Sequence, residues 1–500
     1  MTYVRVRGFE PDADPATPGV LTDCDLLLPT LNGLTAFPSN SDPGIDALPS
    51  AAAAAVSITK LDNSNEVYAA SRGTASIIYK LNGSSWSNIS SGGGSYTAVS
   101  AAQWTFAQLG DQILAAQLGT AIQRTTTATA SFQTMSASAG MFKARIVETV
   151  LDFAVAFNID DSDYDNVYGI APDRWRCSAA GNALDWDPSI ATQATTGRLT
   201  DYPGPITAAK RLGSNLVAYK RDSMFLGQYV GAPEVWRFRG IPGEGLGTWG
   251  PYSVVDIETA HLFWGFDNAY IYDGTRPKPI ATNRVAQWFF ERLNIEQAHL
   301  ILGFHDRQRF RVIWWFPSSA TPVLDRYVAY NYRSDKWAQG EKTIQTTFEL
   351  LAPSVTYDGL NDFFGSTAYD DLPTASYDEW QQTASTPIWT IFDQDNKAYS
   401  LNGTPGDSSL TTGVFGEDEI ITGITRVRPR FKKAPATGQQ THMVLDVQGG
   451  DEDTVTAGTV MYRGGFDHVY AGRWHKFKMD FTGEMEITGI KYVSHQDSQE

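Results

Sequence analysis

The sequence repeats one short pattern along most of its length: an alternating apolar segment, a turn of Gly, Asp or Asn, a second alternating segment, and a tryptophan. The most compact copy joins Leu262-Phe263-Trp264 to Ala269-Tyr270-Ile271-Tyr272 across Asp267-Asn268. Alternation with a period of two on both sides of a turn predicts a β-hairpin. Six such copies begin near Val67, Ile113, Phe153, Leu216, Leu262 and Phe310.

The spacing of these copies, about 40 to 60 residues, is close to the length of one four-stranded propeller blade. A small sheet with two apolar faces buries both when such sheets stack radially around an axis, and only short edges remain exposed. A less regular copy follows around Phe363-Phe364, and another hairpin is predicted at Ile388–Phe392, turning through Asp395-Asn396. We therefore predict an all-β fold, a β-propeller of about six blades, with about seven as the next count. A set of unrelated sandwich hairpins is the alternative.

The domain organisation is predicted from changes along the chain. Residues 1–50 are rich in Pro, Gly and Asp and are expected to form an extended arm, followed by the propeller at 51–402. Helical periodicity is scarce, and Arg284–Leu293 predicts one short helix. Beyond residue 402, alternating strands without a closing tryptophan predict an additional C-terminal β-sandwich domain at 403–500. These strands are Thr422–Phe431, Met443–Val447, Thr459–Tyr462, Trp474–Phe481 and Glu486–Val493.

Charge and cysteine content narrow the range of functions. The 500-residue chain carries 56 acidic and 39 basic residues, a net charge of −17. A broad DNA-neutralising surface is therefore disfavoured, because phosphate affinity comes from Lys and Arg. Two cysteines, Cys24 and Cys177, cannot form a disulfide framework, so free thiols and synthesis in a reducing cytoplasm are expected. The N-terminus lacks the apolar core of a signal peptide, and no run is long enough to span a bilayer, so we expect neither secretion nor membrane insertion.

Two segments resemble binding motifs, but the residues around them do not fit those motifs. Residues 245–250 match G-x-G-x-x-G, yet Pro251 and a strand-like segment follow where a nucleotide-binding helix must begin. Asp160–Asp165 has alternating carboxylates like a calcium loop, but Asn166 and Pro172 occupy the positions that require Gly and Glu. We interpret the first motif as a structural turn and the second as a solvated turn. With no zinc, phosphate-loop or nucleophile motif, we predict no catalytic, cofactor-binding or metal residues and no enzymatic activity.

A glycosidase propeller needs only two facing carboxylates, so motif searches do not exclude one. Turn capping is the simpler role for such aspartates, because Asp bonds to its own backbone two residues on. The candidates beside predicted hairpins are Asp267, Asp273, Asp306, Asp325 and Asp335.

A row of cations lies in the predicted C-terminal domain. In a strand, Arg426, Arg428, Arg430 and Lys432 lie on one face, with Val427 and Phe431 on the other. Four cations in a row on an acidic protein must face water or an acidic partner. Our hypothesis is that this face contacts acidic groups of a neighbouring subunit. The alternative is a solvated edge that prevents sheets from associating.

Several stretches between about residues 200 and 340 form one recognisable series of structural motifs, none with catalytic residues. They are Leu216–Tyr229, Gly240-Ile241-Pro242-Gly243, Leu262–Gly274, Arg284–Leu293, Phe310–Phe316, Pro317-Ser318 and Tyr327–Trp337. This series resembles the tail nozzle (tail hub) proteins of short-tailed phages, a family that includes the packaged-DNA stabilisation proteins.

This resemblance implies a structural virion protein of the tail, assembled in the cytoplasm of the host bacterium. Family members form a homo-oligomeric ring, usually a hexamer, that extends the DNA ejection channel below the portal and the adaptor protein and helps to retain packaged DNA. The implied partners are other copies of the chain, the tail adaptor, a tail fibre, spike or needle, and double-stranded DNA in transient passage. An acidic lumen would repel the phosphate backbone and let DNA slide. A glycan-binding or glycoside-hydrolase propeller and a monomeric adhesion module remain the alternatives.

Overall fold

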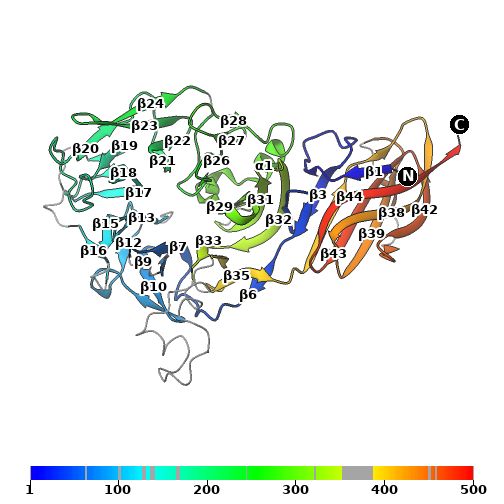
Figure 1. Cartoon of the computed structure of the whole chain (residues 1–500), viewed down its shortest axis with the longest axis horizontal. Helices are drawn as coiled ribbons and strands as arrows, with labels where there is room; N and C mark the ends of the chain where they lie inside the picture. The colour runs from blue at the N-terminus through cyan, green and yellow to red at the C-terminus, as the bar shows by residue number, and fades with distance from the viewer. Residues whose placement is uncertain are drawn as a thin grey trace, which may run out of the picture.

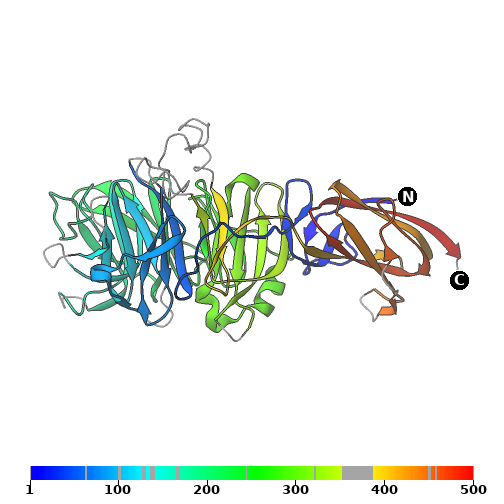
Figure 2. The ribbon, with the colours of Figure 1, turned by 90° about the horizontal axis from the view of Figure 1, so that it is seen from below.

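The computed structural model is an all-β protein in which small antiparallel sheets are arranged as a β-propeller (Figure 1). It describes residues 2–61, 65–98, 103–126, 131–135, 141–164, 169–243, 245–319, 322–351, 387–448, 452–455 and 459–498. Figure 2 shows the propeller sheets at one end and the C-terminal strands at the other.

Five separate four-stranded sheets form propeller blades, and each is named here by its first strand. The β7 sheet contains β7 (Ala52–Thr59), β8 (Asn65–Ser71), β10 (Ile78–Asn82) and β11 (Ser85–Asn88). The β21 sheet contains β21 (Ile206–Leu212), β22 (Asn215–Lys220), β23 (Met224–Gly231) and β24 (Val235–Ile241). The β25 sheet contains β25 (Val254–Asp256), β26 (His261–Trp264), β27 (Ala269–Tyr272) and β28 (Lys278–Pro279). The β29 sheet contains β29 (Leu302–Asp306), β30 (Arg311–Phe316), β31 (Leu324–Asn331) and β32 (Lys336–Ile344). The β33 sheet contains β33 (Thr346–Leu350), β34 (Ile388–Phe392), β35 (Ala398–Gly403) and β6 (Ser39–Ser41).

An eight-stranded sheet, the β13 sheet, lies between the β7 and β21 sheets in the sequence. The first four strands of this sheet are connected to the last four where β15 pairs with β17, through a single residue pair, Ala121 with Lys143. Its strands are β13 (Thr105–Leu109), β14 (Gln112–Gln117), β15 (Thr120–Thr125), β16 (Gln133–Thr134), β17 (Lys143–Val150), β18 (Phe153–Asp160), β19 (Ile170–Cys177) and β20 (Thr195–Arg198). A two-stranded ribbon of β9 (Ala75–Ser76) and β12 (Tyr96–Thr97) accompanies the β7 sheet.

The predicted hairpins are confirmed, but the predicted count of about six blades is not. The six repeats begin at or next to the second strand of each four-strand group: β8, β14, β18, β22, β26 and β30. The hairpin predicted at Ile388 is β34 with β35, and the copy around Phe363-Phe364 lies outside the described residues. The repeats at Ile113 and Phe153 share one sheet, because the pair between β15 and β17 continues the hydrogen-bonded order. Hairpin patterns alone cannot show whether neighbouring hairpins merge.

The predicted short helix is confirmed as α1 (Ala286–Arg292), which packs on the β25 sheet. Its buried Phe289 stacks on Trp264, with ring centroids 3.7 Å apart. Trp288 meets Phe9 edge to face at 4.9 Å, so the N-terminal segment also packs against this helix. Short 3₁₀ segments are η1 (Ser91–Gly93), η3 (Ile295–Leu300) and η4 (Arg307–Arg309).

Residues 1–50 differ from the predicted extended arm, because they supply strands to distant sheets. Three of these strands, β1 (Thr2–Arg5), β3 (Val20–Asp25) and β5 (Leu34–Ala36), pair with strands from the C-terminal half of the chain. The other two pair with their neighbours: β2 (Gly8–Phe9) pairs with β3, and β4 (Leu27–Pro29) pairs with β5. The strand β6 pairs with β35 and so joins the N-terminal segment to the last blade. These strands are short and separated by Pro and Gly, so their alternation is too brief to read locally, and their partners lie hundreds of residues away.

Two larger sheets contain the C-terminal strands. The β38 sheet has the order β4-β5-β44-β38-β42, with β1 on β44, and the β43 sheet has the order β2-β3-β36-β43-β39-β40, with β37 and β41 attached. Three of the five predicted strands are confirmed within β38, β43 and β44, whereas those predicted at Met443–Val447 and Thr459–Tyr462 only overlap β39 and β41, which end at Leu445 and Val460. The strands are β36 (Asp407–Thr412), β37 (Phe415–Gly416), β38 (Ile421–Lys433), β39 (Thr437–Leu445), β40 (Glu452–Val455), β41 (Thr459–Val460), β42 (Phe466–Gly472), β43 (Trp474–Thr482) and β44 (Glu486–Ser498).

The propeller and the two C-terminal sheets share one continuous hydrophobic cluster. It contains Trp264, Trp314 and Trp337 of the blades together with Phe9 and Leu27 of the N-terminal strands. It continues through Leu410, Val427, Phe477, Phe481 and Ile490 of the C-terminal sheets. The N-terminal strands therefore fill the junction between the two parts.

The free thiols expected for Cys24 and Cys177 are confirmed, and both are buried.

A buried histidine connects two neighbouring blades. His261 of β26 lies 2.8 Å from the Tyr219 hydroxyl through Nδ1 and 2.7 Å from the Arg211 carbonyl oxygen through Nε2. Since the carbonyl only accepts, Nε2 carries the proton and Nδ1 accepts from the hydroxyl. Burial lowers the pKa of His261 to about 4.

We expect this histidine to make the fold sensitive to acid. The unfolded chain binds a proton at His261 near its ordinary pKa of 6.5, whereas the folded chain resists protonation down to about 4. The free energy of unfolding should therefore hold above about pH 6.5 and fall by about 3 kcal/mol between there and pH 4 on account of this residue. Urea unfolding of the wild type and of His261→Gln across this range measures the contribution, and the variant should show a shallower slope. Equal dependence of the unfolding free energy on pH in the wild type and the variant would contradict this role of His261.

Candidate functional site

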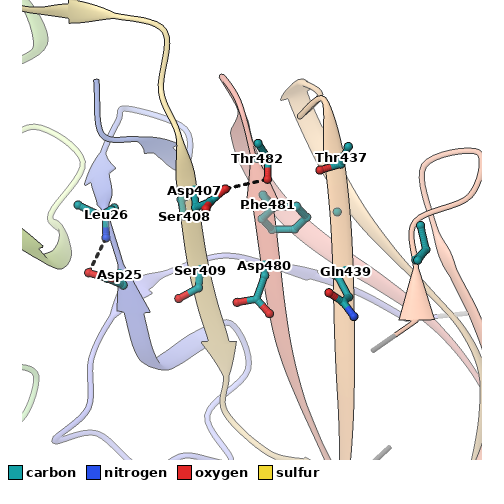
Figure 3. A pocket seen from close by; sticks show the side chains of 12 residues that line it. Asp25, Leu26, Asp407, Ser408, Ser409, Thr437, Gln439, Asp480, Phe481 and Thr482 are labelled. Carbon is teal, nitrogen blue, oxygen red and sulfur yellow. Dashed lines mark hydrogen bonds between the residues drawn. The ribbon is translucent and has the colours of Figure 1, made fainter. Parts of the chain in front are cut away.

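A polar groove of about 580 Å³ lies on the face of the β43 sheet next to the propeller (Figure 3). Its floor is a row of facing residues on four adjacent strands: Asp25 of β3, Ser409 of β36, Asp480 of β43 and Gln439 of β39. Alternation along each strand places Leu410 and Met479 on the opposite, buried face. The remaining lining residues are Leu26, Asp407, Ser408, Thr437, Gly438, Val460, Phe481 and Thr482.

Two of the carboxylates that line this groove, Asp25 and Asp407, accept hydrogen bonds from neighbouring groups. Asp25 accepts from the backbone N–H groups of Leu26 and Glu341, at 2.9 and 2.8 Å, and burial raises its pKa. Asp407 accepts from the Thr482 hydroxyl at 2.9 Å, as the dashed line in Figure 3 shows. Neither His nor Cys is among the lining residues. The groove therefore offers carboxylate, hydroxyl and amide groups for hydrogen bonding.

Sequence reasoning missed this groove. The only local signal is the alternation of polar side chains in β36, where Asp407 and Ser409 are two residues apart. Its other polar residues come from β3, β43 and β39, and only the pairing of these strands brings them together.

Within the described residues, the five aspartates considered as glycosidase carboxylates all have local structural partners. Asp273, Asp306 and Asp325 accept from the backbone N–H groups of Thr275, Arg309 and Ser318. Asp267 and Asp335 accept from the hydroxyls of Tyr270 and Tyr330. The turn between β26 and β27 carries Asp267, whereas Asp273 lies between β27 and β28 at the other end of the same blade. These contacts fit the turn-stabilising role.

The two sequence motifs lie in loops. The glycines of residues 245–250 allow close backbone packing: a Cβ on Gly247 would lie 1.7 Å from the Arg221 carbonyl oxygen. The next strand is β25, and no helix begins there. In the acidic turn, Asp161 forms a buried ion pair with Arg174 at 2.7 Å, and residues 165–168 lie outside the described part. Among the described residues, no group of three or more His, Cys, Asp or Glu is placed to hold a metal ion.

The predicted row of cations lies on β38, where Val427 and Pro429 are buried between the more accessible arginines. Two of its members are neutralised within the chain: Arg426 pairs with Asp467 at 2.7 Å and Lys432 with Glu486 at 3.2 Å. Arg428 and Arg430 form no ion pair with another described residue. Strand irregularities beyond Arg430 interrupt the simple alternation toward Lys432.

Strand pairing adds further cations to this face. Lys491 of β44 lies directly opposite Arg428, and Tyr3 of β1 lies opposite Lys491. In the next row, Gly489 separates Arg430 from Arg5. Like charges in directly opposed positions destabilise a sheet unless an anion or water compensates them. This basic face, defined here as Arg5, Arg428, Arg430 and Lys491, therefore suits a negatively charged partner.

Comparison with known proteins finds only distant similarity to solved structures. No protein-family model matches the chain, and no curated protein matches it. A solved structure of the computationally designed protein Ika8 is similar at 9% identity over 76% of this chain and 96% of that chain, with a TM-score of 0.38. The structure of YCF48 bound to a D1 peptide is similar at 8% identity over 63% of this chain and 86% of that chain, with a TM-score of 0.36. In the described part of the chain, no helix is long and apolar enough to cross a membrane.

Proposed function

We propose that this chain is a structural subunit of a phage tail nozzle and assembles head to tail into a ring, with a hexamer as the expected size. The observation that carries the proposal is the basic face, a group of uncompensated cations on a chain with a net charge of −17. Residues 403–500 contain 14 acidic and 10 basic residues, so the acidic excess extends to the C-terminal part of the chain as well. Arg428, Arg430 and Lys491 of the basic face lie on the β38 sheet.

A ring requires two different, complementary surfaces on each subunit. The basic face and an acidic surface elsewhere on the same chain would provide such a pair, because opposite potentials favour association while like faces repel. In this proposal the basic face of one subunit contacts an acidic surface of the next. The tail adaptor and a fibre, spike or needle are the further partners, the virion tail is the location, and DNA passes through the lumen without specific binding. The role requires no catalysis.

The proposal includes a finer description of the fold. The single residue pair between the halves of the β13 sheet supports treating it as two blades, which with the five separate blades makes seven. Contacts between the β38 and β43 sheets support a β-sandwich: Phe415 and Tyr492 lie 5.2 Å apart, and Phe431 and Phe481 lie 5.4 Å apart. Stacked blades and a packed sandwich give the stiffness that a channel wall needs.

We expect reversal of two charges on the basic face to prevent assembly. Arg428→Glu with Arg430→Glu should raise the dissociation constant between subunits at least about tenfold, since both groups would then repel an acidic neighbour. Light scattering and negative-stain images of the wild type should show a ring with a central hole, whereas the variant should shift toward single chains with an unchanged unfolding temperature.

The matched control reverses two exposed arginines of the propeller, Arg198 and Arg237, whose side chains are 53% and 65% exposed and paired within the chain. This control has the same change in net charge and should still assemble. A wild type that stays single at all concentrations would argue against the ring, and equal weakening in both variants would argue against the basic face.

The polar groove favours glycan binding as a second candidate function. Asp480, Gln439 and Ser409 present carboxylate, amide and hydroxyl groups in one row, which matches the hydrogen-bonding groups of a sugar. Incubation with bacterial surface polysaccharides separates the two candidates: binding lost in Asp480→Ala supports this role, and release of reducing sugar would indicate a hydrolase.

A further inference from the structure

A second, smaller pocket lies where the N-terminal segment meets the propeller, with a volume of about 390 Å³. Four cations line it: Arg5 and Arg7 of the N-terminal segment, Arg284 near α1, and Lys336 of β32. We call it the cationic pocket, because such a group of positive side chains is unusual on a chain with a net charge of −17. The other lining residues are Val6, Leu31, Ser334 and Asp335.

The backbone around this pocket is held by separate parts of the fold. The backbone N–H of Val6 donates to the Thr488 carbonyl oxygen of β44 at 3.1 Å, and that of Arg7 donates to the Gly19 carbonyl oxygen at 2.8 Å. Lys336 begins β32 in the β29 sheet of the propeller. The cations are therefore brought together by the packing of the propeller, the N-terminal segment and the C-terminal sheets.

Internal carboxylates neutralise only part of the positive charge. Arg284 pairs with Glu10 and with Asp335, each at 2.7 Å, and Arg7 lies 3.6 Å from the same Glu10. Arg5 is exposed and forms no ion pair with another described residue. Four cations against these two carboxylates leave an excess of two positive charges at the pocket.

Lys336 is the most buried of the four cations. It is 6% exposed, and its ammonium donates to the carbonyl oxygens of Val6 and Arg7 at 2.6 and 3.3 Å. An ammonium has three N–H groups, so one of them has no acceptor among the described residues. Burial, followed by the charge of Arg5, lowers the pKa of Lys336 to about 8. An anion that accepts from this donor would stabilise the charged lysine.

The exposure of the cations gives the pocket a direction. The Arg7 side chain is 52% exposed and Arg5 is exposed as well, whereas the Arg284 side chain is 19% exposed and Lys336 is buried. An anion that enters between the exposed arginines can therefore approach the buried ammonium.

The excess of two charges fits a phosphate group better than a single carboxylate. A phosphate monoester carries a charge of about −1.5 to −2 at pH 7, and its three oxygens each accept strong hydrogen bonds. Arginine and lysine side chains both bind phosphate through charge-assisted hydrogen bonds. A single carboxylate would neutralise only half of the excess.

We propose that the cationic pocket binds a phosphate group, either free or as the monoester of a small molecule. Lys336, Arg5 and Arg7 donate to the phosphate oxygens, whereas Arg284 stays paired with its own carboxylates and contributes its charge. A ligand there contacts both the N-terminal segment and the propeller, so it stabilises their junction. The site does not depend on ring assembly.

Isothermal titration calorimetry of the full chain with inorganic phosphate, at an ionic strength kept constant with sodium chloride, tests the site. We expect one phosphate per chain and a dissociation constant about tenfold higher for Arg7→Gln, which removes a charged donor. The matched control is Arg237→Gln, because Arg237 is also exposed and paired with a glutamate three residues away. This control should bind like the wild type. Absence of saturable binding by the wild type, or equal weakening by the control, would overturn the proposal.

The pH dependence of binding tests Lys336 itself. The affinity should fall below about pH 6, where phosphate loses its second charge, and above about pH 8, where Lys336 of the empty pocket loses its proton. Lys336→Met should bind at least about tenfold more weakly and lose the fall above pH 8. Lys220→Met should keep both limbs, because Lys220 is likewise buried and bonded to two carbonyl oxygens but lies in the β21 sheet. An unchanged pH profile in Lys336→Met would contradict phosphate binding at this lysine.

A comparison of ligands identifies the form of the phosphate. Tighter binding of ribose 5-phosphate than of inorganic phosphate assigns the pocket to a monoester, and equal affinities assign it to phosphate itself. Citrate should bind more weakly than phosphate, because each of its carboxylates carries one charge. Tighter binding of citrate than of both phosphates would overturn the assignment to phosphate.

Discussion

Replacing Asp306 with alanine is expected to lower the free energy of unfolding by about 3 to 5 kcal/mol, because it leaves a buried guanidinium without its counter-ion. Arg311 is 1% exposed, and its Nε and Nη2 lie 2.8 Å from the Asp306 carboxylate. Burial already lowers the pKa of Arg311 to about 10, which shows how poorly this site solvates the charge. The guanidinium also faces the ring of Trp389 in the β33 sheet at 5.8 Å, so the loss should loosen the contact between two blades.

Urea unfolding of the variant and of a matched control measures this effect. Asp273→Ala removes another turn aspartate, which accepts from Thr275 and pairs with Lys278, but its side chain is 43% exposed. We expect this control to cost no more than about 1 kcal/mol. Adding Arg311→Met to Asp306→Ala should restore most of the lost stability, because the unpaired charge is then absent. Similar costs for Asp306→Ala and Asp273→Ala would show that the buried pair contributes little.

Replacing Trp264 with alanine is expected to cost about 3 to 5 kcal/mol, because it empties a large volume at the junction of the propeller and α1. Trp264 is fully buried, and its ring stacks on Phe289 at 3.7 Å. It also meets Trp314 and Trp337 at 6.1 and 6.0 Å, so one side chain contacts the helix and the neighbouring blade. The surrounding aromatic rings are themselves tightly packed and can fill the cavity only in part.

Trp86→Ala provides the comparison within the same chain. Trp86 is half-buried on β11, donates to the Asp46 carbonyl oxygen at 2.9 Å and approaches Phe392 at 5.9 Å. We expect its replacement to cost about 1 to 2 kcal/mol, since water can fill the space it leaves. Thermal and urea unfolding should rank the two variants in this order. The reverse ranking would mean that the junction around Trp264 contributes less to stability than an outer strand does.

The alternating hairpins could be predicted because their information is local. In the β25 sheet, for example, Leu262–Trp264 and Ala269–Tyr272 alternate across a short turn, so each strand and its partner lie within one stretch of sequence. The same holds for α1, where the apolar residues needed for one buried face follow each other at helical spacing. The turn-stabilising role of the aspartates and the free state of the two thiols also followed from residue type and number.

The pairing of the N-terminal strands and the composition of the polar groove and the basic face could not be predicted in this way. The strands that pair there are distant from one another in the sequence. The row of Asp25, Ser409, Asp480 and Gln439 joins four strands, and nothing near Asp25 in the sequence indicates that β36 will lie beside it. The cations of β38 were visible as a pattern, but Lys491 and Arg5 joined them only through pairing with β44 and β1.

The sequence by itself determined the type of local structure: period-two alternation, turn residues and tryptophans specify small two-faced sheets that must cover one another. The tertiary structure decided how many sheets remain separate, where the first 41 residues pair, and which charges share a face. The physical reason is that hairpin formation depends on neighbouring residues, whereas the pairing of remote strands depends on burying apolar surface throughout the molecule.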